Sequence, residues 1–151
     1  MQELVRVADQ SSVRDCTPVC VQHKGVPYCV VRMQNEIRAY ITICPHEDKA
    51  FTPDMTDRCL VCPFHRVSFD ASTGEVRDRN GKSVPQGLVR VCTETHEGYI
   101  YVVSEDAHHE LLAQSDARRQ ERRRSRKRGP RVWFSFFRER SIRWRQQFKR
   151  K

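Results

Sequence analysis

Two cysteine–histidine pairs lie close together in the segment CPHEDKAFTPDMTDRCLVCPFH, which spans residues 44–65. One residue separates Cys44 from His46, two separate Cys62 from His65, and fifteen lie between the pairs. Thiolate and imidazole ligands favour a borderline-soft metal centre, so zinc and an iron–sulfur cluster are the candidates. In a 2Fe-2S cluster with mixed ligands, two thiolates bind one iron and two neutral histidines bind the other, which raises the reduction potential relative to an all-cysteine cluster.

The combined pattern, C-x-H, fifteen residues and C-x-x-H, followed by FD-x-x-TG, resembles the Rieske ferredoxin family over about residues 3–103. The resemblance implies a small antiparallel β-sandwich or barrel in which two cluster-binding loops form a tip. It implies that Cys44 and Cys62 hold the buried iron of a Rieske-type 2Fe-2S cluster. His46 and His65 would hold the outer iron, near solvent, where an electron leaves.

Several residues of the tip differ from respiratory-chain members of that family. Those proteins carry two more loop cysteines, which form a disulfide, at positions that here hold Lys49 and Phe64. They also carry a Ser and a Tyr that hydrogen-bond the cluster and a cysteine sulfur, at positions that here hold Val67 and Phe69. Hydrogen bonds to sulfur raise the potential. The sequence therefore predicts a ferredoxin-like centre toward the bottom of the Rieske range of roughly −150 to +300 mV.

Two further positions of the tip often carry glycine in this family, and here they hold Asp48 and Arg66. Neither change removes a ligand. Both side chains are charged and larger than the hydrogen of glycine, so they predict a bulky, charged tip whose docking surface differs from that of a standard redox carrier.

Zinc is the alternative occupant, and Cys59, which forms C-L-V-C with Cys62, would then add a ligand of zinc-ribbon type. The C-x-H pair is a poor zinc knuckle and FDASTGE matches the Rieske pattern, so the cluster is favoured. Cys59 is otherwise expected to face the core from a strand, and His108 and His109 are expected to be exposed. The remaining cysteines are expected to be small buried hydrophobes: Cys16, Cys20, Cys29 and Cys92.

Short strands are predicted on both sides of the ligand loops. LVRVA, PVCV, PYCVVR and IRAYITI precede the loops, and LVRVCT and YIYVV follow them. Alternating apolar residues, β-branched and aromatic side chains and the turn clusters between the segments support this prediction. The sequence therefore predicts an all-β fold, with residues 1–104 as one antiparallel domain.

A catalytic domain does not fit into the remainder of the chain. Rieske oxygenases add a large domain with a two-histidine, one-carboxylate iron site, and 151 residues leave no room for it. There is also no flavin or nicotinamide fingerprint. We therefore expect an electron-transfer component with no small-molecule substrate, not an autonomous enzyme.

The charge of the chain is divided unevenly. Residues 1–117 carry 12 Lys and Arg against 17 Asp and Glu, whereas residues 118–151 carry 16 against 2. This asymmetry predicts a polyanionic partner for the basic segment alone.

Residues 105–151 are predicted to form a helical or partner-ordered extension with a break at Gly129–Pro130. Its first part has little apolar surface beyond Leu111 and Leu112, so any helix there is expected to be solvated or to lie against a partner. Guanidinium groups suit phosphate contact and aromatic rings stack on unpaired bases. The residues predicted to contact RNA or a partner are Arg122, Arg123, Arg124, Arg126, Lys127, Arg128, Trp133, Phe137, Trp144 and Phe148.

Other partners of the basic segment are an anionic membrane surface and an acidic protein. RRRSRKR also fits a nuclear address. The chain has an odd number of cysteines, 7, and the N-terminal MQELVRVADQSS has no apolar signal segment. These features predict a reducing intracellular compartment, with the mitochondrial matrix favoured over cytosol or nucleus.

The sequence supports two main functional hypotheses. The first is a low-potential carrier of single electrons that works with a redox partner protein. The second is a cluster-bearing subunit or assembly factor of a ribonucleoprotein such as a mitochondrial ribosome, in which the cluster is structural and residues 118–151 bind RNA. A membrane-surface redox subunit is a third possibility.

Overall fold

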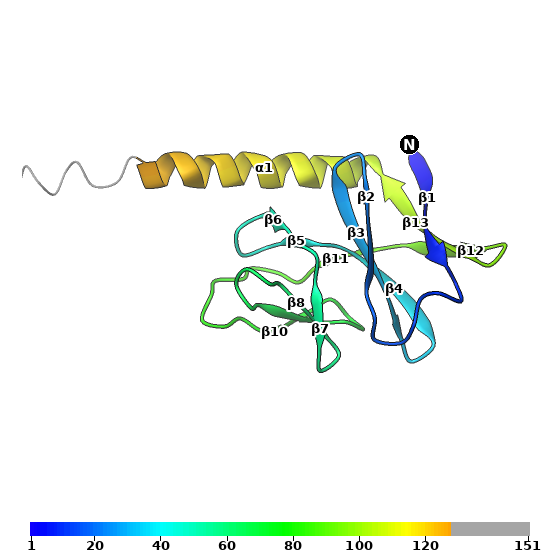
Figure 1. Cartoon of the computed structure of the whole chain (residues 1–151). Helices are drawn as coiled ribbons and strands as arrows, with labels where there is room; N and C mark the ends of the chain where they lie inside the picture. Colours follow the sequence, from blue (N-terminus) through cyan, green and yellow to red (C-terminus); the bar gives the residue numbers. More distant parts are fainter. Residues whose placement is uncertain (128–151) are drawn as a thin grey trace, which may run out of the picture. The chain divides into compact units, whose positions relative to one another are not determined.

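The computed structural model describes residues 1–127, in which short strands precede one helix (Figure 1). The elements are β1 (Gln2–Asp9), β2 (Val19–His23), β3 (Val26–Met33), β4 (Glu36–Ile41), β5 (Ile43–Cys44), β6 (Lys49–Ala50), β7 (Asp54–Thr56), β8 (Cys59–Val61), β9 (Ser68–Asp70), β10 (Val76–Asp78), β11 (Val89–Val91), β12 (Thr93–His96), β13 (Tyr99–Glu105) and α1 (Asp106–Lys127). All pairings between these strands are antiparallel. The predicted all-β class is confirmed.

The sheet in the order β11-β4-β3-β2 is the central layer of the fold. Successive side chains of a strand point to opposite faces, so Val30 and Val31 of β3 belong to two different hydrophobic cores. Ala39 and Tyr40 of β4 divide in the same way. A strand that is buried on both faces requires a nearly continuous apolar sequence, which VPYCVVRM of β3 supplies.

The first core lies between the central sheet and the sheet in the order β1-β13-β12. Val102 of β13 and Tyr28 of β3 are fully buried in it. The first half of α1 covers this core, because Leu111 and Leu112 pack against it. The expectation that this part of the helix is solvated or lies against a partner is therefore wrong.

His108 completes the contact between α1 and the strands. Its Nδ1 accepts a hydrogen bond from the Glu105 amide at 3.2 Å and lies 3.3 Å from the Tyr28 hydroxyl. Burial lowers the pKa of His108, which favours the neutral ring that this acceptor role requires. The expectation that His108 is exposed is wrong, since it lies on the same helix face as Leu111, Leu112 and the buried Ser115.

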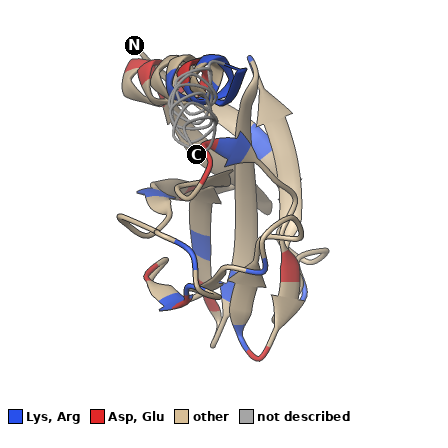
Figure 2. Ribbon diagram, turned by 90° about the vertical axis from the view of Figure 1, so that its left-hand side faces the viewer, with Lys and Arg blue, Asp and Glu red and all other residues tan. Residues whose placement is uncertain are grey.

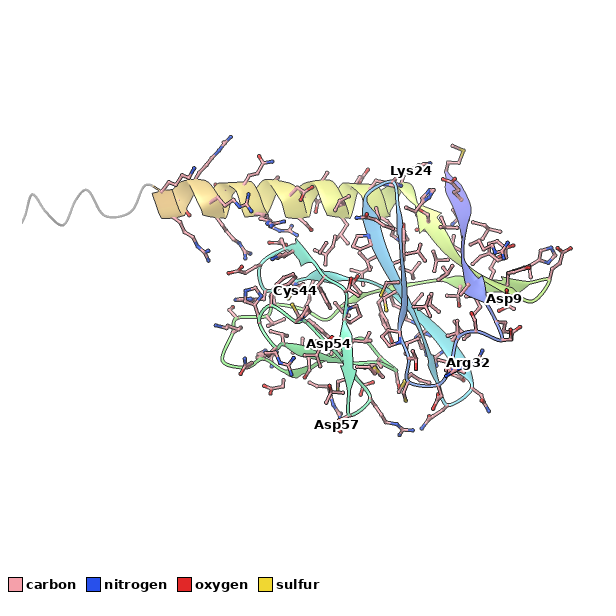
Figure 3. All side chains as sticks on the ribbon, in the orientation of Figure 1. Asp9, Lys24, Arg32, Cys44, Asp54 and Asp57 are labelled. Atoms are coloured by element: carbon pink, nitrogen blue, oxygen red, sulfur yellow. The ribbon has the colours of Figure 1, made fainter. Side chains whose placement is uncertain are left out.

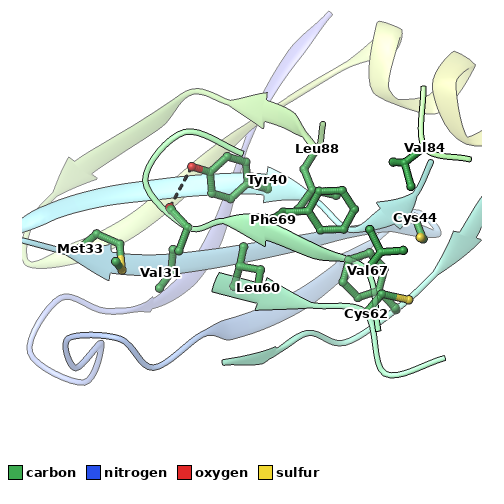
Figure 4. Close-up of a cluster of buried hydrophobic side chains, with 12 residues drawn as sticks. Val31, Met33, Tyr40, Cys44, Leu60, Cys62, Val67, Phe69, Val84 and Leu88 are labelled. Atoms are coloured by element: carbon green, nitrogen blue, oxygen red, sulfur yellow. Dashed lines mark hydrogen bonds between the residues drawn. The ribbon is translucent and has the colours of Figure 1, made fainter. Parts of the chain in front are cut away.

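The second core lies on the other face of the central sheet and contains Cys44 and Cys62. Leu60 of β8 and Phe69 of β9 pack against Tyr40, whose hydroxyl donates a hydrogen bond to the carbonyl of Ala71 at 2.9 Å. Figure 4 shows the sulfur atoms of both cysteines at one end of this cluster, beside Val67.

The turn after β9 explains the glycine of the motif FD-x-x-TG. Gly74 has a φ of +80°, and its carbonyl accepts a hydrogen bond from the Leu88 amide at 2.8 Å. A Cβ at Gly74 would lie 2.7 Å from Cε1 of Tyr40, and one at Gly87 would lie 2.4 Å from the carbonyl oxygen of Gly74. The two glycines therefore allow a close backbone approach that ties this turn to the segment before β11.

The chain divides into two compact units, Met1–Arg119 and Gln120–Lys151, and residues 120–127 of the second unit continue α1. The last turn of α1 is basic, and Figure 2 colours the charged residues of the described chain. No helix within residues 1–127 is long and apolar enough to cross a membrane. The predicted contacts of Arg128 and the aromatic residues of the tail, and the break at Gly129–Pro130, lie outside the described residues.

Substitution Gly87→Ala is expected to lower the free energy of unfolding by about 3 kcal/mol or more, the upper end for overpacking. The added Cβ would meet backbone, which cannot move without disturbing the Leu88–Gly74 hydrogen bond. Gly81→Ala is the control, because its Cβ meets no described atom within 4 Å and only its φ of +69° is strained. That strain costs about 1–2 kcal/mol. Equal losses of thermal stability in both variants would contradict the close approach.

Candidate metal centre

The two ligand loops are built alike, each as a tight turn that follows a buried cysteine. The amide of Asp48 donates to the carbonyl of Cys44 at 2.8 Å, and the amide of Arg66 donates to the carbonyl of Cys62 at 2.9 Å. Both closing residues have positive φ, +56° for Asp48 and +57° for Arg66. Glycine adopts this conformation freely, which explains its frequency here in the family that the sequence resembles. Asp and Arg each cost about 1–2 kcal/mol more.

The thiols of Cys44 and Cys62 meet inside the second core, where both residues are fully buried. The hydrogen bond that they share, followed by burial, raises the pKa of Cys44, whereas the same hydrogen bond lowers the pKa of Cys62 to about 5. Backbone amides from the residues after each cysteine also hydrogen-bond its sulfur. These amides favour the thiolate, which is the form that binds metal.

The two histidines stand next to these thiols. The rings of His46 and His65 have centroids 4.5 Å apart and an interplanar angle of 77°. The Nδ1 atom of His65 is buried, and its Nε2 lies 3.3 Å from Oε2 of Glu47. The ligand atoms of Cys44, Cys62 and His65 all lie within 4.8 Å of one another.

This arrangement fits a mixed-ligand 2Fe-2S cluster, because the two loops bring two thiols and two imidazoles to one place. Figure 3 shows Cys44 at the ligand loops, with Asp54 at the start of β7 and Asp57 beyond its other end. Cys59 lies in β8 opposite Thr56 and Asp70, outside the groups of described residues that could hold a metal. The geometry therefore does not support the zinc-ribbon alternative.

A cation–π contact joins the two ligand loops. Nζ of Lys49 lies 3.3 Å from the centroid of the Phe64 ring, which is 51% exposed. These are the two positions at which respiratory-chain members of the resembled family carry the disulfide. A charge on an aromatic face contributes about 0.5–1 kcal/mol at an exposed site, so the loops are held together by a weaker, non-covalent contact.

The residues at the expected hydroxyl positions are apolar and fully buried. Val67 and Phe69 pack in the same core as Cys44 and Cys62. Neither side chain can donate a hydrogen bond to sulfur, so the hydrogen bonds to the thiols come from the backbone, from the side chain of His65 and from the thiols themselves.

An ion pair between the half-exposed Arg118 and the buried Asp48, which the sequence patterns did not predict, connects α1 to the first ligand loop. Nε and Nη2 of Arg118 donate to Oδ1 of Asp48 at 3.0 and 2.8 Å, and Asp48 is only 5% exposed. The hydrogen bond to Asp48 raises the pKa of Arg118. Arg118, the first residue of the segment predicted to bind RNA, therefore pairs within the β domain itself.

Glu47 is the other residue of the site that was not predicted from the sequence. Its Oε2 lies 3.3 Å from Nε2 of His65, so a contact with this carboxylate leaves the buried Nδ1 as the ring nitrogen available to bind metal. Glutamate is common on protein surfaces, so its position directly after His46 gave no specific signal in the sequence.

The burial of the remaining cysteines differs in part from the prediction that all of them are buried. Cys29 is buried as predicted, but Cys16 is half-buried and Cys20 and Cys92 are exposed. In β2 the apolar Val19 and Val21 alternate with exposed residues, and Cys20 falls on the exposed side.

A family model described as "Rieske [2Fe-2S] domain" matches residues 3–86. The chain belongs to this family, and its cofactor is a Rieske-type 2Fe-2S cluster. The candidate ligands Cys44, His46, Cys62 and His65 all lie within the matched segment.

Several solved structures share the fold. One chain from the complex of reduced oxygenase and oxidized ferredoxin in carbazole 1,9a-dioxygenase has 26% identity and a TM-score of 0.56, over 68% of this chain and 94% of that one. The Sphingomonas yanoikuyae B1 ferredoxin has 22% identity and a TM-score of 0.56, over 68% of this chain and 100% of that one. The quaternary ammonium Rieske monooxygenase CntA has 18% identity and a TM-score of 0.56.

The alignment with CntA covers 66% of this chain and 31% of that chain, so the present protein spans about a third of the monooxygenase. A search of curated protein sequences finds no match.

Substitution Arg118→Ala is expected to lower the free energy of unfolding by about 1.5–3 kcal/mol, because it leaves the buried Asp48 carboxylate without its charged donor. Arg123→Ala is the matched control, since Arg123 is exposed on the same helix. The thermal midpoint and the half-life of the visible cluster absorbance report the effect. Loss of stability to the same extent in both variants would show that the ion pair does not hold the loop.

The Lys49–Phe64 contact is expected to give a coupling energy of about 0.5–1 kcal/mol in a double-mutant cycle. Lys49→Met keeps most of the aliphatic stem and removes the charge, and Phe64→Leu removes the ring. Chemical denaturation of the two single variants and the double variant measures the coupling. Strictly additive effects would mean that the charge and the ring do not interact in solution.

Proposed function

We propose that this protein is a low-potential carrier of single electrons, which it exchanges with a partner protein at the tip formed by His46 and His65. The observation that carries the proposal is the difference in burial between the cysteine and the histidine ligands. Cys44 and Cys62 are fully buried, whereas the histidines are partly exposed, with His65 at 20%. When bound, the cluster supplies one-electron oxidation and reduction.

The chain's own residues prepare this tip for electron exchange. Glu47 holds the His65 ring by its Nε2, which fixes both the tautomer and the orientation of the ring. Core residues such as Val67 exclude water from the side of the thiols. The shortest way from the buried thiols to a partner protein therefore passes through the imidazole rings.

The apolar side chains of Val67 and Phe69 support a low potential. They stand where a hydroxyl would stabilise the reduced state by a hydrogen bond to sulfur. We therefore place the reduction potential toward the bottom of the Rieske range of roughly −150 to +300 mV.

The proposed partner is a redox protein. One of the similar structures is a complex of a reduced oxygenase and an oxidized ferredoxin, which supports this class of partner without identifying it. The tip carries exposed charge on Arg66, which lies 3.7 Å from Asp54, and the Lys49 charge lies over Phe64. Such a mixed tip favours a partner surface with matching charges of both signs.

The ribonucleoprotein hypothesis receives no support from the matched family or from the names of the similar structures. Five of its predicted contact residues are described, and all are exposed in the last turns of α1: Arg122, Arg123, Arg124, Arg126 and Lys127. RNA binding by residues 118–151 stays a prediction. A reducing compartment, with the mitochondrial matrix favoured, also remains part of the proposal.

Protein purified without oxygen is expected to contain iron and acid-labile sulfide in equal amounts and to show a mixed-ligand spectrum. Substitution His65→Cys should move the potential toward the value of about −400 mV that is typical of all-cysteine clusters. Val67→Ser should raise the potential, because it can place a hydroxyl near sulfur. His96→Cys is the control for the first change, since His96 is 73% exposed and lies in β12.

Stoichiometric zinc without iron would contradict the proposed cofactor chemistry. A wild-type potential near the top of the range would contradict the low-potential assignment but leave the carrier function standing. Unchanged electron exchange with a chemical reductant and a protein acceptor after His65→Cys would contradict the exit route through the histidines.

A further inference from the structure

Two cysteines that are not ligands face each other across the hairpin formed by β2 and β3. Cys20 of β2 is the direct cross-strand partner of Cys29 of β3. Cys29 is fully buried, and Cys20 is exposed. The remaining non-ligand cysteines among the described residues have no cysteine as cross-strand partner.

The hairpin geometry shows which kind of pair this is. Lys24 and Gly25 both have positive φ, +47° and +86°, as in the two-residue turn of type I′. The residues next to such a turn, His23 and Val26, form a hydrogen-bonded pair. Hydrogen-bonded and non-hydrogen-bonded pairs then alternate along the ladder. Pro27 has no amide hydrogen and occupies the next, non-hydrogen-bonded position, as the alternation requires.

Cys20 and Cys29 lie two positions beyond the pair that contains Pro27, so they also form a non-hydrogen-bonded pair. In such pairs the Cα atoms are about 4.5 Å apart and the side chains approach closely. Disulfides form across Cα separations of about 4.4–6.8 Å. The backbone is therefore already arranged for a disulfide between the two strands.

The environment of the two thiols differs in a way that suits thiol exchange. They share a hydrogen bond, which lowers the pKa of Cys20 and raises the pKa of Cys29. Cys20 lines an open hollow of about 380 Å³ together with Thr42, Phe51 and Phe64. A small disulfide can therefore reach the more acidic sulfur of Cys20, while the sulfur of Cys29 is buried next to it.

We propose that Cys20 and Cys29 are a redox-active dithiol that is reversibly oxidised to a disulfide by a small disulfide such as oxidised glutathione. The Cys20 thiolate attacks the glutathione disulfide, forms a mixed disulfide and releases one glutathione thiolate, which takes up a proton. Cys29 then loses its proton and attacks the Cys20 sulfur, which releases the second glutathione. Two protein thiols become one disulfide, and one glutathione disulfide becomes two thiols.

This function is separate from the electron transfer proposed for the cluster. The cluster changes by one electron and the dithiol by two, and Cys44 and Cys62 are buried in the second core. The hollow beside Cys20 includes Phe64, which belongs to the second ligand loop and carries the Lys49 contact. Oxidation therefore alters the sheet surface directly next to the tip.

The test uses the full chain with its cluster in a Cys16→Ser background, treated with oxidised glutathione without oxygen. Trypsin cleaves after Arg14, Lys24 and Arg32, so a Cys20–Cys29 disulfide links peptide 15–24 to peptide 25–32. After alkylation of free thiols, we expect the linked peptides in most chains, and their disappearance after treatment with dithiothreitol. The visible absorbance of the cluster should stay unchanged.

Three variants make the result decisive. Cys29→Ala should trap Cys20 as a stable glutathione adduct, and Cys20→Ser should leave Cys29 unmodified. Cys92→Ser is the control, because Cys92 is exposed but has no opposing cysteine, and this variant should link the two peptides as the parent does. A parent protein that keeps the glutathione adduct on Cys20 to the same extent as Cys29→Ala, or that leaves Cys20 unmodified, would overturn the proposal.

Discussion

The contact between two thiols inside an apolar core is the interaction on which the rest of the structure depends. Cys44 and Cys62 come from different loops and meet at the end of the second core, where each binds iron as a thiolate. A buried thiolate is costly unless backbone amides or a metal balance its charge. Tight turns aim those amides at sulfur, and they require a left-handed residue at Asp48 and Arg66.

The helix stabilises the more demanding of these turns. Asp48 combines a strained backbone with a buried carboxylate, and a domain without α1 would leave that charge without the guanidinium of Arg118. Removing Arg118 alone would leave the buried Asp48 carboxylate without this charged donor, which is more destabilising than replacing both residues. The contact of Leu111 and Leu112 with the first core fixes the helix at the distance that this ion pair requires. Both cores therefore contribute to the geometry of one loop.

Local patterns in the sequence were sufficient to predict most of the fold and the candidate ligands. The alternation in segments such as PYCVVR predicted the long strands, and the C-x-H and C-x-x-H spacings predicted two adjacent ligand loops. The short strands β6, β7 and β10 could not be predicted, because two or three residues do not show an alternation. The packing of α1 was missed because polar His108 and Ser115 make up half of its buried stripe.

Contacts between distant residues could not be predicted from such patterns. Asp48 and Arg118 are separated by 70 positions, and nothing in either neighbourhood indicates the other. Lys49 and Phe64 were identified as departures from a family pattern, but the pattern did not show that their side chains meet. The exposure of Cys20 depends on the register of β2, which follows from the turn at Lys24 and not from the cysteine itself.

The Lys49–Phe64 contact gives the ligand loops a different evolutionary freedom from that of a disulfide. A disulfide works only when both cysteines are present, so either substitution alone removes the whole link. A lysine can be exchanged for arginine, or a phenylalanine for tyrosine, while part of the attraction remains. Selection can therefore adjust the strength of this connection in small steps, independently of the redox state of the surrounding thiols.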